Sequence, residues 1–198
     1  MKAFDTATRA VRAAIDTDAQ HGSVIPPLHL STTHSFESFG VKRQYDYCRS
    51  GNPTRDALAN ALCELEGAAA ATVVASGMAA VHLVGQLLKP GELVVIPHDC
   101  YGGTYRLFTH LARRGQFELA IVDQTDPLAL EHALAREPKL LWIETPSNPL
   151  LRLVDIQHLC ERAHARDTLV CVDNTFLSPA LQQPFELGAD LVIHSTTK

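Results

Sequence analysis

Residues 140–175 read LLWIETPSNPLLRLVDIQHLCERAHARDTLVCVDNT, and this stretch decides the fold of the chain. Two short apolar runs, Leu140–Glu144 and Leu169–Asp173, enclose a stretch with helical periodicity at Asp155–Arg166, whose first residue can cap a helix. A strand, a helix and a strand in this order are typical of a crossover between two parallel strands. The stretch therefore predicts an α/β fold with a parallel sheet.

The alternation of apolar runs and helical stretches continues on both sides. Because strands that are apolar throughout are buried on both faces, we expect a mostly parallel sheet that is flanked by helices and belongs to a domain of residues 54–198. Asp126 followed by Pro127 predicts a capped helix start with proline in the first turn. Further strands are predicted at Ala71–Ala75, Leu93–Pro97, Leu119–Asp123 and Leu191–Ser195, and further helices at Met78–Leu88, Thr104–Arg113 and Asp126–Arg136.

Residues 1–53 have a different character. From Gly22 to Pro53 the chain holds many prolines, glycines and hydroxyl side chains and shows little periodicity, so we expect an irregular N-terminal arm with a short helix. A regular helix is predicted from Arg55 to Glu66, with Thr54 as its cap and Gly67 at its end.

The composition limits the classes of function. The chain has 198 residues, 46% of them hydrophobic and 20% charged, which is ordinary for a globular domain. Its 17 Lys and Arg against 22 Asp and Glu leave a net charge of −5 without a basic run, so nucleic acid is not an expected partner. Five cysteines, an odd number without a C-x-x-C pair, favour a reducing compartment, and we expect a cytoplasmic protein.

One uncharged segment, residues 67–88, is long enough to span a membrane. The segment is rich in alanine, however, contains Ser76, Gly77, His82 and Gln86, and changes its period midway. We therefore expect a strand, a turn and a helix here, and no membrane partner.

The ends of the predicted strands carry the residues of chemical interest, because ligands of open parallel sheets bind outside the carboxyl ends of the strands. Asp173 ends one strand and Lys198 follows the end of the next. Neighbouring strands lie about 4.8 Å apart, so both side chains can reach one pocket. Pyridoxal 5′-phosphate (PLP) needs an amine that forms a Schiff base and a carboxylate that keeps the pyridine nitrogen protonated. This pair therefore points to PLP as a cofactor.

Other strand ends supply what the rest of this cofactor requires. Gly77 and Met78 begin a predicted helix, whose free N–H groups and positive dipole end favour a phosphate. Ser195 and Thr197 add hydroxyl groups, and the ring of Tyr101 could stack on the pyridine face. Each feature alone has an ordinary explanation as a helix cap, a metal ligand, a nucleotide-binding turn or a packed loop. Their order at consecutive strand ends is what favours PLP.

A family resemblance rests on six stretches, namely Tyr47–Thr54 (YCRSGNPT), Ser76–Met78 (SGM), Asp99–Thr104 (DCYGGT), Glu144–Pro149 (ETPSNP), Val172–Phe176 (VDNTF) and His194–Lys198 (HSTTK). From about Thr6 to its last residue the chain resembles the Cys/Met-metabolism PLP-dependent enzymes of fold type I. Residues 97–108 are most similar to the cystathionine γ-synthase branch. The resemblance implies the large domain of an aspartate aminotransferase-like PLP-dependent transferase, here truncated.

The resemblance also implies roles for individual residues. Lys198 would hold the cofactor and shuttle protons, and with Tyr101, which stacks on the ring, it forms the candidate catalytic set. Asp173 would pair with the pyridinium, while Gly77, Met78, Ser195 and Thr197 bind the phosphate. Tyr47 and Arg49 would reach the cofactor phosphate of a neighbouring subunit, which implies a homo-oligomer, a dimer or a tetramer.

The implied reaction is γ-replacement on an O-acylhomoserine by cysteine, which gives cystathionine in methionine biosynthesis. Arg106 is our candidate for the distal carboxylate of the ester, with a solvated first-turn arginine as the alternative, and Asn148 is a second substrate candidate. Cystathionine γ-lyase, methionine γ-lyase and O-acylhomoserine sulfhydrylase are alternatives within the same chemistry. A non-catalytic fragment is the alternative from another class.

The chain departs from the family pattern in two places. Cys48 stands where serine is common. Members of the family continue past the lysine with an antiparallel strand and a C-terminal domain, which we expect to be absent here, so that the chain alone would leave sheet edges uncovered and fold poorly.

Other cofactor classes are disfavoured by the sequence. It has no G-x-G-x-x-G after the first predicted strand and no Walker-type run, and His158 and His164 fall on opposite sides of a helix, so no metal site is expected.

Overall fold

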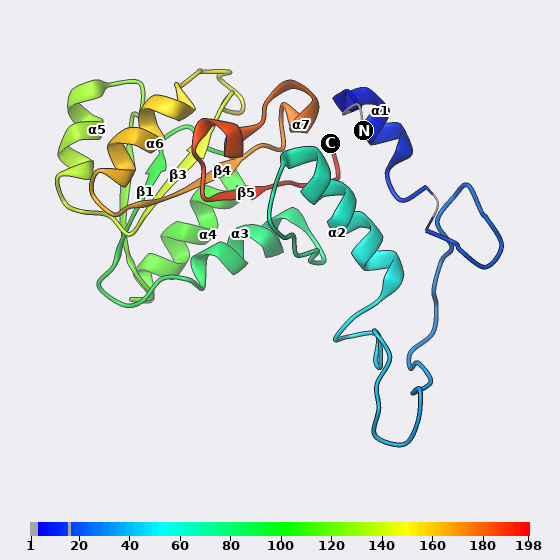
Figure 1. The fold of residues 1–198 in the computed structure, drawn as a ribbon. Coiled ribbons are helices and arrows are strands. Elements are labelled where there is room, and N and C mark those ends of the chain that lie inside the picture. The colour runs from blue at the N-terminus through cyan, green and yellow to red at the C-terminus, as the bar shows by residue number, and fades with distance from the viewer. Residues whose placement is uncertain (1–3, 16) are drawn as a thin grey trace. The chain divides into compact units, whose positions relative to one another are not determined.

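The computed structural model describes residues 4–15 and 17–198 and divides the chain into two compact units, Met1–Val73 and Val74–Lys198 (Figure 1). Each unit is described separately below.

The C-terminal unit is built on a sheet of five strands in the order β2-β1-β3-β4-β5, and all four neighbouring pairs are parallel. Strands β1 and β3 are buried at every position, as expected for the middle of a sheet that is covered on both faces. The parallel α/β class predicted from residues 140–175 is confirmed. The strands are β1 (Leu93–Pro97), β2 (Glu118–Val122), β3 (Leu140–Glu144), β4 (Leu169–Asp173) and β5 (Leu191–Ile193).

Helices cover both faces of this sheet (Figure 1). Because successive side chains of a strand point to opposite faces, Val94 and Ile96 pack in one core cluster and Val95 in the other. The first cluster includes residues of α3 and α4 together with Trp142, and the second includes residues of α5 and α6. The helices of this unit are α3 (Gly77–Gly85), α4 (Gly102–Arg113), α5 (Pro127–Leu134), α6 (Ile156–His164) and α7 (Ser178–Leu181), followed by the 3₁₀ helix η1 (Pro184–Leu187).

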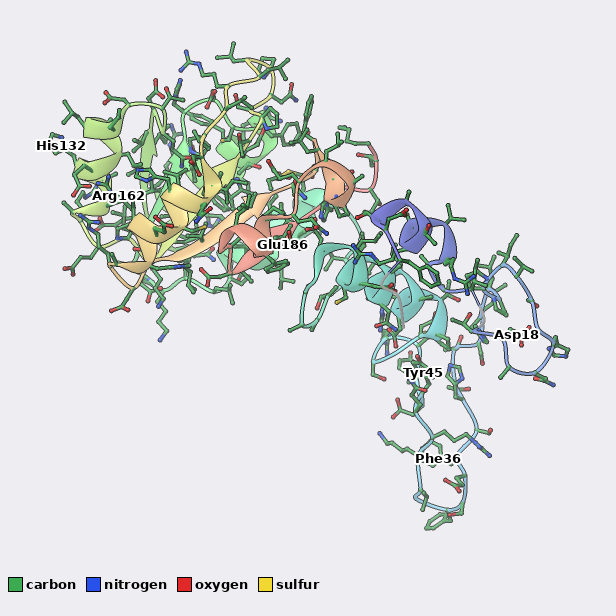
Figure 2. All side chains as sticks on the ribbon, turned by 45° about the horizontal axis from the view of Figure 1, so that its top comes forward. Asp18, Phe36, Tyr45, His132, Arg162 and Glu186 are labelled. Carbon is green, nitrogen blue, oxygen red and sulfur yellow. The ribbon has the colours of Figure 1, made fainter. Side chains whose placement is uncertain are left out.

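Specific contacts hold these helices in place. The ring of Phe108 in α4 packs edge-on against Trp142 of β3, with centroids 5.3 Å apart, and against Phe117 at 5.6 Å. On the other face, Glu131 of α5 forms ion pairs with Arg162 of α6 and with Arg166 just beyond it. Figure 2 shows Arg162 and His132 on these two adjacent helices.

The predicted helix starts at Asp126 and Asp155 are confirmed. Asp126 accepts hydrogen bonds from the N–H groups of Leu128 and Ala129, and Asp155 accepts one from His158. Both caps depend only on residues within one turn of the chain, which is why the sequence was sufficient to locate them.

The strand predicted at Ala71–Ala75 is wrong. This run has no regular secondary structure, and it pairs with no strand in the part of the chain that the structure describes. A strand exists only where a second strand accepts and donates its backbone hydrogen bonds, so an apolar run without such a partner stays irregular.

The described residues of the N-terminal unit form two helices, α1 (Thr6–Arg12) and α2 (Pro53–Glu66), and α1 contacts α2 through a hydrogen bond of 2.8 Å from Arg9 to the Glu64 carbonyl. The described residues between these helices, 13–15 and 17–52, are irregular apart from two isolated bridges, Thr33 to Tyr47 and Ser38 to Val41. Most of its apolar side chains are exposed, including Phe36, which Figure 2 labels.

The cap of α2 differs from the prediction. The cap is Asn52, two residues earlier than expected, and its side chain accepts hydrogen bonds from the N–H groups of Thr54 and Arg55. The Thr54 hydroxyl instead accepts a hydrogen bond of 2.9 Å from the N–H of His29, which ties the irregular segment to the start of α2. Thr54 therefore serves a long-range contact that local sequence rules do not predict.

No helix among the described residues has the length and apolar character needed to cross a membrane. The uncharged segment of residues 67–88 forms an irregular stretch followed by α3, which has nine residues.

Candidate active site

The candidate site lies at the carboxyl ends of the strands in the C-terminal unit. Glu144 and Asp173 end the neighbouring strands β3 and β4 and are partners in the register of that pair, so two acidic residues stand side by side. Both are buried, each with 8% of its surface exposed.

Asp173 is held by the segment that follows it. Its Oδ1 accepts a hydrogen bond of 3.1 Å from the N–H of Thr175. Burial raises the pKa of this carboxyl, while the hydrogen bonds from Thr175 and the nearby His194 lower it. A cationic group beside Asp173, such as the protonated nitrogen of a pyridine ring, would favour the ionised form of this carboxyl.

A cradle for an anion forms where α3 begins. As the first residues of the helix, Gly77 and Met78 have N–H groups without an intrahelical acceptor, and Ser76 caps the helix by accepting from Ala79 at 3.1 Å. A methyl group at Gly77 would lie only 2.6 Å from Cβ of Ser195, so the absence of a side chain lets these two segments meet.

Two hydroxyl groups face each other beside this helix start. The Ser195 Oγ lies 2.9 Å from the Thr197 Oγ1, and the backbone N–H of Ser195 donates to the Thr175 hydroxyl at 2.8 Å. Free N–H groups, a helix N-terminus and two hydroxyls are the donor set that binds a phosphate, so the residues present fit the phosphate group of PLP.

Tyr101 lies at the start of α4 with 46% of its surface exposed, so its ring is accessible. The ring folds back over Gly103, where an added methyl group would lie 2.4 Å from the Tyr101 Cε1 and 2.7 Å from the Met78 Sδ. Glycine at this position therefore allows two of the candidate cofactor residues, from different helix starts, to approach the same point.

Glu144 is a site residue whose role the sequence did not suggest. Its Oε2 accepts a hydrogen bond of 2.7 Å from the N–H of Tyr101, and its Oε1 accepts one of 3.2 Å from the N–H of Asn148. Burial, and next the negative charges of Asp173 and Asp99, raise its pKa to about 7, although both N–H donors lower it. Its place at a strand end beside Asp173 was the signal that could have identified it.

The remaining candidates of this unit lie at its surface. Arg106 is exposed on the first turns of α4, and its Nη1 would lie 3.1 Å from a methyl group at Gly102, so its guanidinium folds back over the helix start. Asn148 is exposed in the loop after β3, and Lys198 is exposed directly after Thr197.

Tyr47 and Arg49 belong to the N-terminal unit and contact each other. The Arg49 guanidinium carbon lies 4.6 Å from the centroid of the Tyr47 ring. The N–H of Cys48, between them, donates to the Thr32 carbonyl at 2.9 Å, so this pair is held on the irregular segment by backbone hydrogen bonds.

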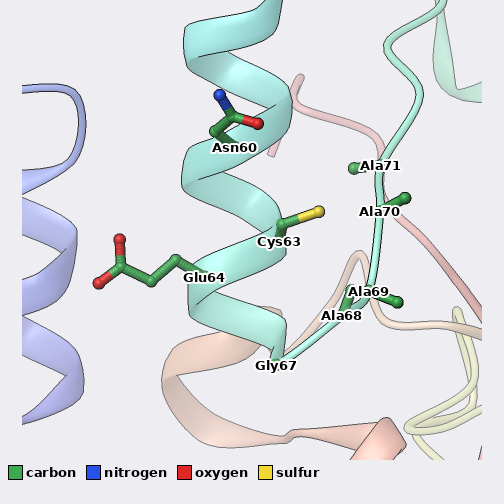
Figure 3. Close-up of a pocket in the computed structure, with 8 residues that line it drawn as sticks. All are labelled: Asn60, Cys63, Glu64, Gly67, Ala68, Ala69, Ala70 and Ala71. Carbon is green, nitrogen blue, oxygen red and sulfur yellow. The ribbon is translucent and has the colours of Figure 1, made fainter. Parts of the chain in front are cut away.

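A hollow of about 590 Å³ in the N-terminal unit is not the candidate site. Figure 3 shows the Cys63 sulfur facing the alanine-rich segment of residues 68–71, while the Glu64 carboxylate points away from it. The lining residues include no cation and form no cluster of catalytic groups. Within the described part of the chain, no group of three or more His, Cys, Asp or Glu side chains could hold a metal ion.

A parallel α/β sheet with a buried carboxyl, a helix start that fits a phosphate and an accessible aromatic ring at its carboxyl edge has the features of the large domain of a PLP-dependent enzyme. The profile described as Cys/Met metabolism PLP-dependent enzyme matches residues 7–198, and the chain belongs to this family.

Individual relatives agree with this family. Cystathionine gamma-synthase of Escherichia coli (strain K12) is 56% identical over 193 residues, which cover 97% of this chain and 50% of that protein. Cystathionine beta-lyase of Lactococcus lactis subsp. cremoris (strain MG1363) is 40% identical over 191 residues, or 96% of this chain and 50% of that protein.

A solved structure shows the same fold. Cystathionine gamma synthase from Xanthomonas oryzae pv. oryzae, in complex with aminoacrylate and cysteine, superimposes with a TM-score of 0.97 and 56% identity, covering 99% of this chain and 51% of that one. The chain thus spans about half the length of the relatives it matches.

Proposed function

We propose that this chain forms the cofactor-binding half of an enzyme that exchanges the acyloxy group of an O-acylhomoserine for the sulfur of cysteine, giving cystathionine. The observation that carries the proposal is the convergence of buried Asp173, the cradle at Gly77 and Ser195, and the Tyr101 ring at one sheet edge. The 56% identity to a cystathionine gamma-synthase supports this reaction over others in the family.

Each residue of the edge has a distinct task in this proposal. When bound, PLP supplies an electron-withdrawing ring that stabilises negative charge on the substrate carbon next to it. Asp173 keeps the proton on the ring nitrogen, and the N–H groups of Gly77 and Met78 with the hydroxyls of Ser195 and Thr197 hold the phosphate. Tyr101 covers one face of the ring.

Lys198 is the proposed covalent attachment point and proton carrier. A lysine amine would condense with the cofactor aldehyde with loss of water and, once the substrate amine has displaced it, could move protons between neighbouring carbons of the substrate. Arg106 and Asn148 are the proposed substrate contacts. The guanidinium of Arg106, exposed beside Gly102, would bind the distal carboxylate of a succinyl-type ester.

Tyr47 and Arg49 carry the proposal of a homo-oligomer, a dimer or a tetramer. Stacked on each other in the arm of residues 1–53, they present one planar guanidinium and one hydroxyl, which suit a phosphate. We propose that they bind the cofactor phosphate of a neighbouring subunit.

Covalent trapping tests the proposal. A chimera, in which Lys198 is followed by the second half of the E. coli relative, is mixed with PLP, reduced with borohydride, and mapped by mass spectrometry. We expect one pyridoxyl adduct, on Lys198, which Lys198→Ala abolishes, Asp173→Ala strongly reduces, and the matched control Lys139→Ala at an exposed surface lysine leaves unchanged. Adducts scattered over surface lysines would contradict the assignment of the site.

A second assay separates the synthase from the lyases. The same chimera is given either O-succinylhomoserine with cysteine or cystathionine alone. Formation of cystathionine from the first pair supports the proposed reaction. Faster breakdown of cystathionine than its formation would assign the chain to the lyases instead.

A further inference from the structure

Glu144 has a position that the proposed roles do not explain. It is buried at the end of β3, and each of its two oxygens accepts a backbone N–H from a different loop. One donor belongs to Tyr101, proposed to cover the cofactor ring, and the other to Asn148, proposed to contact the substrate. One side chain therefore contacts the backbone of both segments.

Another hydrogen bond joins the same two loops, with the donor in the loop after β3 and the acceptor in the loop after β1. The Ser147 hydroxyl, in the loop after β3, donates to the Asp99 Oδ2 at 2.6 Å, in the loop after β1. Ser147 Oγ in turn accepts the N–H of Arg152 at 3.2 Å. Glu144 at the end of β3 thus accepts a donor from the loop after β1, and Asp99 in that loop accepts a donor from the loop after β3. We call the five residues that join the two loops the strand-end clasp, namely Asp99, Tyr101, Glu144, Ser147 and Asn148.

The clasp uses both oxygens of the Glu144 side chain as acceptors. An ionised carboxylate accepts hydrogen bonds on both oxygens, whereas a glutamine accepts on one and presents N–H donors at the other. The ionised form is held at a cost, because the Glu144 side chain is buried and Asp173 and Asp99 place two further carboxyls nearby. Burial and the charges of Glu144 and Asp99 likewise raise the pKa of the Cys100 thiol. A purely structural hydrogen bond could use a neutral acceptor and avoid this repulsion.

We infer that Glu144 is a positioning residue, which sets Tyr101 over the cofactor ring and Asn148 beside the substrate through one shared carboxylate. The inference rests on the proposed function, since it assigns the two segments their roles in the PLP site. It adds a coupling between them, because displacing either N–H leaves one Glu144 oxygen unpaired in a buried site and disturbs the other contact.

The first part of the test needs no cofactor. Hydrogen exchange of individual amides is measured in the chimera with the wild-type sequence, with Glu144→Gln, and with Glu118→Gln, which makes the same change at an exposed glutamate of β2. Glu144→Gln is expected to speed exchange of the Tyr101 or the Asn148 amide by about tenfold, the effect of losing one such hydrogen bond. Unchanged protection of both amides in Glu144→Gln would overturn the clasp.

The second part measures the cofactor. Trp142, the single tryptophan of the chain, lies in β3 and is fully buried, so quenching of its emission reports PLP binding and the visible spectrum reports the environment of the ring. We expect Glu144→Gln to weaken PLP binding by about tenfold and to shift the visible band, with Glu144→Asp partly restoring both and Glu118→Gln matching wild type. Wild-type affinity and spectrum in Glu144→Gln would overturn the positioning role even if the amides exchange faster.

Two controls separate the possible failures. If Glu144→Gln does not fold, Ser147→Ala serves instead, because it removes the hydrogen bond to Asp99 without changing a charge. The same faster exchange of the Tyr101 amide and the same loss of PLP affinity are expected in Ser147→Ala. Wild-type exchange and affinity in this variant would then refute the inference. If the wild-type chain and its chimera bind no PLP at Lys198, the proposed function itself fails, and the positioning role fails with it.

Discussion

Replacing Gly77 by alanine puts a methyl group where the structure has no room for one. The added carbon would lie 2.6 Å from the Ser195 Cβ, 2.8 Å from its Oγ and 3.2 Å from its Cα. Carbon atoms in contact are ordinarily about 3.5–4.0 Å apart, so Ser195 and its backbone would have to retreat by roughly 1 Å.

This displacement should affect stability and cofactor binding together. Forcing a methyl group into a packed site costs about 1–3 kcal/mol, and we expect the free energy of unfolding of Gly77→Ala to fall by that amount. Because the Ser195 hydroxyl leaves the phosphate cradle, PLP affinity should fall by at least about tenfold, which corresponds to about 1.4 kcal/mol.

The same helix supplies a matched control. A methyl group at Gly85, at the other end of α3, would meet the nearest atoms of Leu111, Phe108 and Phe117 at 3.6, 3.7 and 3.8 Å, which are ordinary contacts. Gly85→Ala should keep wild-type PLP affinity, and its unfolding free energy should stay equal or rise by up to about 1 kcal/mol through helix propensity.

Urea unfolding followed by circular dichroism measures the stability of both variants, and quenching of Trp142 emission with trapping at Lys198 measures PLP binding. Equal PLP affinity in Gly77→Ala and Gly85→Ala would refute the phosphate cradle. A Gly77→Ala chain as stable as wild type would show that the approach of α3 to Ser195 is looser than the structure indicates.

Three further predictions concern charge. The pKa of Glu144, raised from 4.5 to about 7, means that the folded chain binds this proton more tightly than the unfolded chain, so the Glu144 contribution to stability is lost as pH rises from about 4.5 to about 7. The unfolding free energy of the wild type, measured in urea, should therefore fall by up to about 3 kcal/mol more than that of Glu144→Gln between these pH values. Asp173→Asn should lower the Glu144 pKa in a carbon-13 NMR titration, and a rise would contradict the repulsion between the two carboxyls. Arg106→Ala in the chimera should raise KM for O-succinylhomoserine more than for an uncharged ester, and equal increases for the two substrates would remove Arg106 from the substrate site.

Some features of the site could be predicted because they depend on position along a strand. Asp173, Ser195 and Tyr101 follow apolar runs, and in a parallel sheet all such positions meet at one edge. Glu144 also ends a strand, but its role depends on backbone N–H groups of two other loops, which no local pattern reveals.

The sequence by itself determined the parallel α/β class, the positions of β1 to β5 to within two residues, and the caps of α5 and α6. These features arise from side-chain periodicity and from hydrogen bonds within one helical turn, so nearby residues specify them. The tertiary structure alone decided that Ala71–Ala75 is not a strand, that Gly77 and Gly103 must lack side chains, and that Glu144 bridges two loops. Strand pairing, close approach and shared hydrogen bonds join atoms that are distant in the chain, and their positions are known only after the segments have packed.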